Sequence, residues 1–188
     1  MGSVFLDMAM SLDGFIAGPN GEDRGLYDWY FAAYGNAAER SATVIDELIR
    51  SIGAMILGRR AYGTGNEQGG FADNPYQVPH FVLSHAPAEP VVQGPMSFTF
   101  VTDGIESALT QAKAAAGNKD VCVAGGANIA QQYLRAGLID EIQLHLVPVL
   151  LGEGLRLFDH LGTQPIALER TRVVEGSGVT HLRFRVVR

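Results

Sequence analysis

The chain has 188 residues, a length that suits one well-buried domain spanning 1–188 and is short for two. A hydrophobic fraction of 47% with 18% charged residues is typical of a folded globular protein, and a net charge of −6 argues against nucleic acid as the main partner. No apolar run reaches the roughly 20 residues that span a bilayer, and Cys122 alone forms no intrachain disulfide, so we expect a cytoplasmic protein without a membrane partner.

The first part of the chain predicts a buried strand, a loop and a helix. The segment 3–12, SVFLDMAMSL, is apolar enough for a buried strand, and the Gly- and Pro-rich segment 13–25 predicts a loop. Apolar residues recur at helical spacing around Val44 and Leu48, which predicts a helix over 36–52.

The middle of the chain alternates short strands with loops and helices. AMIL (54–57), HFVLS (80–84), SFTFV (97–101) and DVCVA (120–124) predict strands. The segment 63–75 predicts a loop. Helices are predicted over 105–116 and 128–136, each followed by a glycine that can end it.

The last part predicts three strands. In LIDEIQLHLVPV (138–149), Ile142, Leu144 and Leu146 alternate with Gln143, His145 and Val147. The segments 166–174 and 179–187 predict a hairpin that turns at 176–178. In that hairpin Val173 pairs with Leu182, and four arginines share the opposite face: Arg170, Arg172, Arg183 and Arg185. The face with the arginines is either exposed to solvent, or it forms a subunit contact or a second anion site. We therefore predict a mixed, mostly parallel sheet that ends in an antiparallel hairpin.

Three strand ends carry residues suited to binding phosphate. Gly58-Arg59-Arg60, Ser84 and Gly125-Gly126 each follow a predicted strand, where open α/β sheets bind ligands. Glycine lets a pyrophosphate approach the backbone at a helix N-terminus, and a guanidinium grips a phosphate. Each signal alone also fits an ordinary turn. The G-x-G-x-x-G fingerprint and the P-loop motif are both missing.

Four segments together resemble a known family. MSLDGFIAGPNG, ILGRRAY, FVLS and VAGGANIAQQYLRAGLIDEIQLHLVPVLLGEGLRLF resemble the dihydrofolate-reductase-like fold, and most closely the reductase domain of bacterial riboflavin biosynthesis and its stand-alone relatives. The resemblance implies an α/β three-layer fold with a central mixed, mostly parallel sheet and a C-terminal antiparallel hairpin. It also implies NADPH as the cofactor and a homodimer.

The resemblance also assigns residues to the cofactor. It implies that Gly58, Arg59, Arg60 and Ser84 hold the 2′-phosphate and adenosine end, and that Gly125 and Gly126, commonly joined by a cis peptide, hold the pyrophosphate with Ala127, Asn128 and Ile129. The loop from Asp13 to Gly18, including Ala17, would flank the nicotinamide.

Departures from the family pattern leave the substrate open. Ala61 stands where the family usually has threonine. The segment LYDWYFAAYG replaces the proline-tryptophan and helical carboxylate of true dihydrofolate reductases, which makes folate a doubtful substrate. The zinc deaminase signature H-x-E…P-C-x-x-C is missing, which excludes a dual-function riboflavin enzyme.

Two residues are candidates for acting on the substrate. Asp13 is either a proton donor or substrate anchor, or the first residue of an Asp-Gly turn whose carboxylate satisfies its own backbone. His145 either faces the cleft, where it could donate a hydrogen bond to a substrate, or is packed or surface-exposed. Trp29 and Tyr30 are either core or a substrate-stacking lid, and the five histidines show no metal-ligand spacing.

The sequence thus predicts an NADPH-dependent oxidoreductase that transfers hydride to a small carbonyl, imine or heterocyclic substrate. It resembles 5-amino-6-(5-phosphoribosylamino)uracil reductase and dihydrofolate reductase. The alternative is a nucleotide-binding protein that uses the same pocket without turnover.

Overall fold

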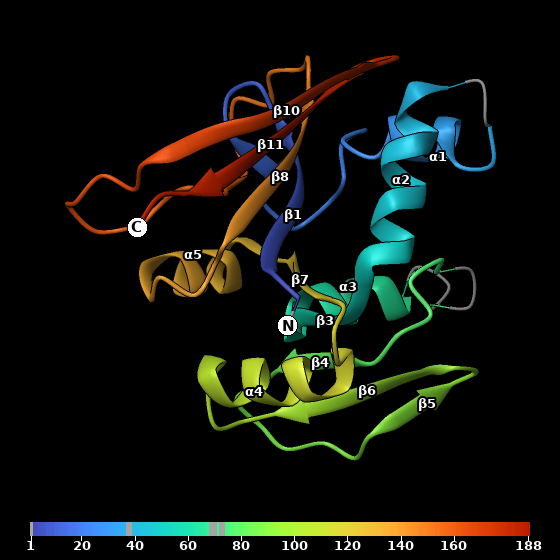
Figure 1. Ribbon diagram of the computed structural model, residues 1–188, viewed down its shortest axis with the longest axis vertical. Helices are drawn as coiled ribbons and strands as arrows, with labels where there is room; N and C mark the ends of the chain where they lie inside the picture. Colours follow the sequence, from blue (N-terminus) through green and yellow to red (C-terminus); the bar gives the residue numbers. More distant parts are fainter. Residues whose placement is uncertain (1, 37–38, 68–70, 72–73) are drawn as a thin grey trace.

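The computed structural model describes residues 2–36, 39–67, 71 and 74–188, and within them the chain is built on one large sheet (Figure 1). The sheet has nine strands in the order β10-β11-β8-β1-β7-β3-β4-β6-β5, and β2 and β9 form a separate pair. The strands are β1 (Val4–Ser11), β2 (Phe15–Ala17), β3 (Ile52–Gly58), β4 (His80–Leu83), β5 (Val91–Gln93), β6 (Met96–Val101), β7 (Asp120–Gly125), β8 (Glu141–Val147), β9 (Leu155–Arg156), β10 (Leu168–Gly176) and β11 (Val179–Val186). The central neighbours from β8 to β6 all pair in parallel, whereas β11 with β8, β10 with β11 and β5 with β6 are antiparallel.

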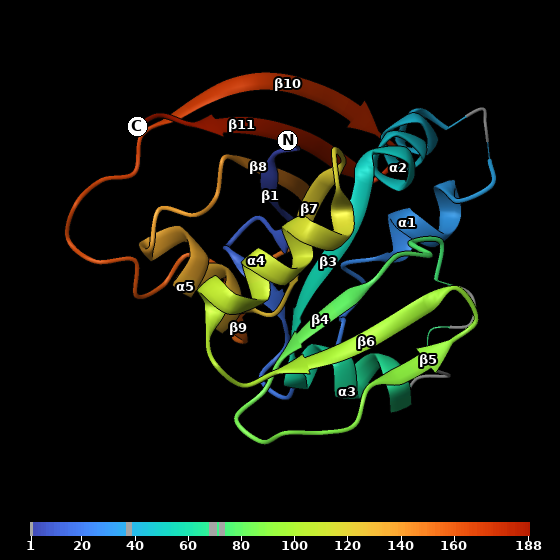
Figure 2. The same cartoon turned by 60° about the horizontal axis from the view of Figure 1, so that its bottom comes forward.

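Helices cover both faces of this sheet, which gives the predicted three layers (Figure 2). The helices are α1 (Asp28–Ala33), α2 (Arg40–Ser51), α3 (Arg59–Glu67), α4 (Ile105–Ala116) and α5 (Ala127–Arg135). α4 and α5 pack on one face, while α1, α2 and α3 lie on the other. None of the helices among the described residues is long and apolar enough to cross a membrane.

Strand β1 contributes side chains to the hydrophobic clusters on both faces of the sheet. Its even-numbered residues, such as Leu6 and Met8, join the main core beneath α4 and α5. Phe5 points the other way and packs with Leu48 of α2 and with Cys122 of β7. Cys122 is fully buried, and burial raises the pKa of its thiol, as expected for a small apolar core residue.

Most of the predicted elements are confirmed, but the loop predicted over 13–25 contains the short strand β2 (Phe15–Ala17). The predicted helix over 36–52 forms as α2, and residues 37–38 of that prediction lie outside the described part of the chain. The loop predicted over 63–75 is wrong in its first part, because α3 continues to Glu67, while 68–70 and 72–73 are not described. Tyr62 anchors this Gly-containing helix by packing against Phe98 and Phe100.

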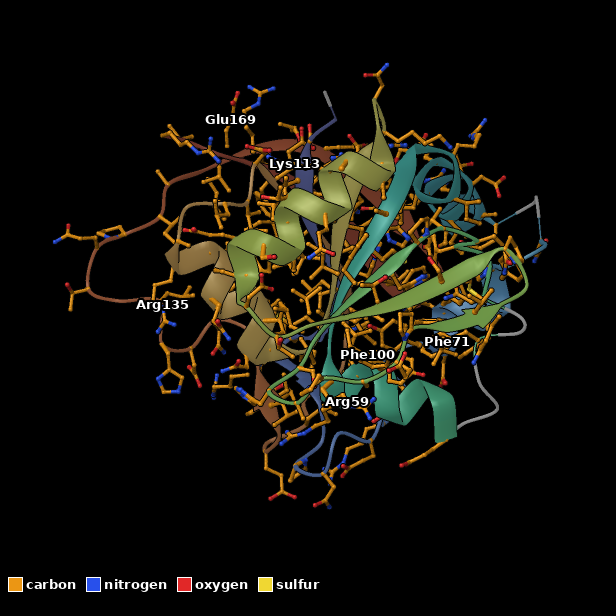
Figure 3. The ribbon with its side chains drawn as sticks, turned by 90° about the horizontal axis from the view of Figure 1, so that it is seen from below. Arg59, Phe71, Phe100, Lys113, Arg135 and Glu169 are labelled. Carbon is orange, nitrogen blue, oxygen red and sulfur yellow. The ribbon has the colours of Figure 1, made fainter. Side chains whose placement is uncertain are left out.

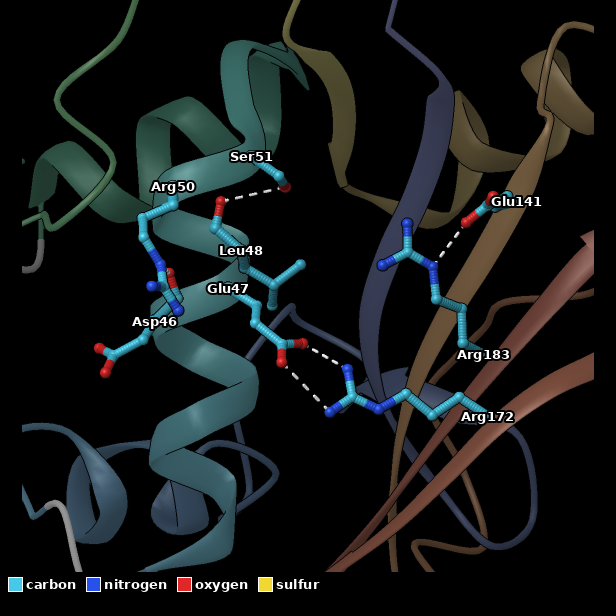
Figure 4. Close-up of polar contacts among 8 residues, drawn as sticks. All are labelled: Asp46, Glu47, Leu48, Arg50, Ser51, Glu141, Arg172 and Arg183. Carbon is cyan, nitrogen blue, oxygen red and sulfur yellow. Dashed lines mark hydrogen bonds and ion pairs between the residues drawn. The ribbon is translucent and has the colours of Figure 1, made fainter.

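The C-terminal hairpin pairs Val173 with Leu182 as predicted, but its four arginines do not all share one face. A bulge between Arg170 and Arg172 pairs Arg170 with Phe184, a residue of the α5 side. Arg172 forms a forked ion pair with Glu47 of α2, and Arg183 donates to Glu141 at 2.5 Å (Figure 4). Arg185 pairs with Glu169. Three of the four cations are therefore balanced within the chain, which argues against an anion site on this face.

Candidate functional site

The predicted phosphate-binding residues meet at one edge of the sheet. β3, β4 and β7 run parallel, so Gly58, Leu83 with the following Ser84, and Gly125 all come at the carboxyl ends of their strands. Gly58 also lies close to α5, because a Cβ on it would stand 2.9 Å from the Ile129 Cγ1 atom. Crevices at this edge of open α/β sheets are where ligands bind.

The Gly125–Gly126 peptide bond is cis, as the family resemblance implied. Gly126 is the N-cap of α5, and a Cβ on it would have no described atom within 4 Å. The backbone is therefore bare at a helix N-terminus, where Ala127, Asn128 and Ile129 carry N–H groups without intrahelical acceptors. The Asn128 side chain is occupied, since its Oδ1 accepts from Gln132 Nε2 at 2.7 Å.

Arg59 is the first residue of α3, and two aromatic rings hold its guanidinium. The Arg59 Cζ atom lies 5.3 Å from the Tyr62 ring centroid and 5.1 Å from that of Phe100 (Figure 3). Both Arg59 and Arg60 are exposed, and neither forms an ion pair with any described residue. Cations without acidic partners are unusual at a helix N-terminus, where the dipole disfavours positive charge.

A surface groove runs beside Arg59. It is lined by Arg59, Tyr62, Gly63, Glu67, Ala88, Glu89, Val91 and Phe100. The nearby Ser84 hydroxyl donates to the Ala86 carbonyl oxygen at 2.8 Å and accepts from the Ala86 N–H at 3.3 Å. The Ser84 side chain therefore shapes this turn, and its oxygen stays at the strand end next to α3.

Asp13 holds a loop together. Its carboxylate accepts from Ser11 Oγ at 2.6 Å, from the Gly152 N–H at 2.8 Å and from the Leu151 N–H at 3.1 Å. The Ser11 hydroxyl and the two backbone N–H groups lower the pKa of Asp13 to about 2, so the carboxylate is ionised at neutral pH. These contacts favour the turn-stabilising interpretation of Asp13 over the proton donor.

The same loop is closed by tight backbone packing. A Cβ on Gly154 would stand 2.1 Å from the Ala17 carbonyl oxygen, so only glycine fits there. The Gly18 N–H donates to the Glu22 carbonyl oxygen at 2.8 Å. The loop that is predicted to flank the nicotinamide is thus fixed against residues 151–154, which are far from it in the sequence.

His145 does not reach the surface. It is 2% exposed, and both its ring nitrogens have partners: Nε2 lies 2.9 Å from Asp7 Oδ1 and Nδ1 lies 2.6 Å from His181 Nδ1. The Trp29 ring packs against it with centroids 4.6 Å apart. His145 is packed, and any effect it has on a ligand must pass through Asp7.

Asp7 is a partly exposed carboxylate to which the sequence analysis gives no role. It belongs to a strand that the sequence predicts to be buried, yet its side chain is 18% exposed and lies on the same strand face as Phe5. The signal was a single charge inside an apolar strand, together with His145 on the equivalent face of the neighbouring strand. Its carboxylate acts electrostatically on Tyr27, Tyr30 and Tyr76.

Comparison with known proteins places this geometry in context. The family model described as the RibD C-terminal domain matches residues 3–182. The uncharacterized protein YyaP of Bacillus subtilis (strain 168) is 29% identical over 165 residues, which cover 82% of this chain and 79% of YyaP.

Two solved structures share the fold. A Shewanella sp. PV-4 protein provisionally assigned to riboflavin biosynthesis matches with a TM-score of 0.77 at 24% identity, covering 99% of both chains. The Thermotoga maritima diaminohydroxyphosphoribosylaminopyrimidine deaminase/5-amino-6-(5-phosphoribosylamino)uracil reductase matches with a TM-score of 0.68 at 15% identity. That match covers 99% of this chain and 57% of the Thermotoga protein, so this chain spans little more than half of it.

Proposed function

We propose that this chain, which belongs to the RibD C-terminal domain family, is an NADPH-dependent reductase of a small heterocyclic, carbonyl or imine substrate. Membership of the family supports a pyrimidine-reductase-like activity. The name of the Thermotoga protein includes 5-amino-6-(5-phosphoribosylamino)uracil reductase. We take the substrate in that name as the model for the substrate class proposed here.

One observation carries the proposal: two arginines without an ion-pair partner among the described residues lie at the same sheet edge as a bare glycine backbone. Gly126 opens the N-terminus of α5, and Arg59 and Arg60 begin α3 at the end of the adjacent strand β3. A dinucleotide phosphate has two kinds of site there, backbone N–H groups and guanidinium groups. The residues present therefore fit NADPH.

The described residues bind and orient, and the bound cofactor would supply the hydride. We propose that Arg59, Arg60 and Ser84 hold the 2′-phosphate end. We further propose that Gly58, Gly125 and Gly126, with the first turn of α5 (Ala127, Asn128 and Ile129), hold the pyrophosphate. The loop containing Ala17 and Gly18, clamped by Asp13, would exclude water beside the nicotinamide.

The test is NADPH oxidation, followed at the nicotinamide absorbance, with a substrate panel. The panel contains 5-amino-6-(5-phosphoribosylamino)uracil, dihydrofolate, cyclic imines and simple carbonyl compounds. We expect turnover with at least one heterocycle or imine, and calorimetric binding of NADPH without substrate. Binding without turnover of any compound would favour the non-catalytic nucleotide-binding alternative, and failure to bind NADPH would refute both. The homodimer stays a prediction, which light scattering can check.

A further inference from the structure

Four polar side chains form a continuous chain of hydrogen bonds beneath α1 and α2. Asp7 Oδ1 lies 2.9 Å from His145 Nε2, His145 Nδ1 lies 2.6 Å from His181 Nδ1, and His181 Nε2 lies 2.9 Å from Ser41 Oγ. They come from β1, β8, β11 and the first turn of α2. His145, His181 and Ser41 are each at most 2% exposed.

The strand register builds this chain. His181 lies directly opposite His145 in the antiparallel pair of β11 and β8. Ala9 lies opposite His145 on the other side, and its small side chain leaves room for the imidazole to lean toward Asp7. The Trp29 ring covers both imidazoles, with centroids 4.6 Å and 4.9 Å away. Burying this many polar groups is costly unless each is hydrogen-bonded.

When Asp7 is ionised and both imidazoles are neutral, one arrangement of ring protons satisfies the chain. The carboxylate can only accept, so His145 donates from Nε2 and its Nδ1 becomes an acceptor. His181 then donates from Nδ1 and accepts at Nε2 from the Ser41 hydroxyl, whose oxygen lies 2.9 Å from Nε2 and 3.4 Å from its other acceptor, Glu39 Oε1. Burial and the neighbouring His145 lower the pKa of His181 to about 4, so that ring is neutral at physiological pH, as this arrangement requires.

The chain uses one oxygen of Asp7 and leaves the other free. None of the described residues hydrogen-bonds to Asp7 Oδ2, whereas Oδ1 is held by His145. Two donors on the same side of the sheet, the Trp29 indole N–H and the Tyr30 hydroxyl, are buried without a partner among the described residues. Two unpartnered donors and a free carboxylate oxygen on the same side of the sheet are polar groups that a ligand could satisfy.

Asp7 also lies beside the predicted cofactor site. The parallel register that pairs Leu6 with Val123 sets Asp7 next to Ala124, the residue before Gly125–Gly126. The groups that interact electrostatically with Asp7 are Tyr27, Tyr30, Tyr76, Cys122 and His181, and His145 is in contact with it. No arginine or lysine within the described residues pairs with Asp7, so its negative charge is left for a ligand.

We propose that Asp7 is the anionic anchor of the substrate, and that Ser41, His181 and His145 are positioning residues that hold its carboxylate in one orientation. The ligand class is a nitrogen heterocycle or imine that presents an N–H pair or a positive charge. This inference rests on the proposed reductase function only for the reaction that the bound substrate undergoes. The binding role of Asp7 does not depend on it. A protonated C=N held at Asp7 would become a neutral amine on receiving at carbon the hydride that the bound cofactor would supply, so no further proton would be needed.

The first experiment compares two planar probes of similar size, 2,4-diaminopyrimidine and uracil, by calorimetry. The diamino compound offers an amidine-type N–H pair to a carboxylate, and uracil offers oxygens at the same positions. A charge-assisted hydrogen bond contributes about 1.5–3 kcal/mol, so Asp7→Asn should weaken binding of the diamino probe by roughly ten- to a hundred-fold. Uracil binding should change little. Equal binding of the two probes by the parent protein, or no loss in Asp7→Asn, overturns the proposal.

The second experiment tests the positioning residues with a matched pair of serine variants on α2. Ser41→Ala removes the end of the hydrogen-bond chain, whereas Ser51→Ala removes a hydroxyl that donates to the Leu48 carbonyl oxygen at the other end of the helix. We expect Ser41→Ala to weaken binding of the diamino probe several-fold and to leave NADPH binding unchanged. Ser51→Ala should change neither affinity. Equal effects of the two variants on binding of the diamino probe would show that Ser41 acts only as an ordinary helix residue. That result would contradict its positioning role.

The third experiment needs no ligand. In ¹⁵N-histidine-labelled protein, protonated and unprotonated imidazole nitrogens differ strongly in chemical shift. Near neutral pH we expect the proton of His145 on Nε2 and that of His181 on Nδ1. An unprotonated His145 Nε2 would mean that Asp7 donates rather than accepts, and the anionic anchor would be wrong. If NADPH does not bind or turn over, the reductase proposal fails, while the probe and tautomer results still decide the role of Asp7.

Discussion

Arg59 allows the cofactor assignment to be tested at a single side chain. NADPH and NADH differ only at the ribose 2′-position, where NADPH carries a phosphate. The Arg59 guanidinium is exposed, has no ion-pair partner among the described residues and lies over both the Tyr62 and Phe100 rings. These two cation–π contacts restrict the guanidinium before a ligand arrives, which reduces the entropy lost on binding. We predict that Arg59→Ala weakens NADPH binding selectively.

The size of the effect follows from the contact that is lost. A charge-assisted hydrogen bond contributes about 1.5–3 kcal/mol, which corresponds to roughly a ten- to hundred-fold change in Kd. Because Arg59 is exposed, the lower end of that range applies, and raising the salt concentration should shrink the difference further. Loss of the two cation–π contacts should cost about 1 kcal/mol of stability, a fall in Tm of about 2–4 °C for a chain of this size.

The assay is calorimetric titration of NADPH and NADH against the parent protein, Arg59→Ala, Arg59→Lys and Arg60→Ala. Arg59→Lys keeps the charge without the planar fork, so it should fall between the parent and Arg59→Ala. Arg135→Ala is the control, since Arg135 is an exposed arginine on α5 remote from Arg59 (Figure 3). Equal affinities for both cofactors in the parent, or equal losses for both in Arg59→Ala and Arg60→Ala, would refute the reasoning.

Three further changes should have distinct effects. Gly126→Ala should weaken NADPH and NADH equally without a large loss in Tm, because the new methyl group meets no described atom but covers the α5 N-terminus; selective loss of NADPH would contradict this. The lowered pKa of Asp13 predicts stability that is present above about pH 4 and lost as pH falls toward about 2, and chemical denaturation of Asp13→Asn should no longer show that loss. Burial lowers the pKa of His80 to about 4, so the stability it contributes is present above about pH 6.5 and lost as pH falls toward 4; His80→Asn should flatten that slope, and an unchanged slope would count against it.

The sequence predicts most of the sheet because strand patterning is local. The 105–116 helix, the hairpin register at Val173 and Leu182, and the cis peptide at Gly125–Gly126 were all expected and are present. The short helix α3 was not expected, because the glycines in RRAYGTGNE disfavour a helix. Tertiary packing of Tyr62 on Phe98 and Phe100 outweighs that local preference, and local patterning does not show it.

The position of His145 shows a different limit. Alternation along 138–149 correctly separates His145 from Ile142, Leu144 and Leu146, but it does not tell whether the second face is open or covered. In a three-layer fold both faces of the sheet are covered, and here Trp29 lies over the imidazole. The partners of His145 come from β1 and β11, which are far away in sequence, so only the strand order brings Asp7 and His181 to it.

Strand β1 explains why Asp7 rather than Asp13 is the carboxylate left for a ligand. On the face toward α2 the side chains are, in order, Phe5, Asp7, Ala9 and Ser11, so two polar groups follow the apolar Phe5. Asp13 follows at the sheet edge, where Ser11 and two backbone N–H groups use both its oxygens to fix a loop. Asp7 lies deeper, and a buried imidazole holds one of its oxygens while the other has no partner among the described residues. A carboxylate whose hydrogen bonds are complete stabilises the protein, and one that is rigidly held but half satisfied can bind a ligand.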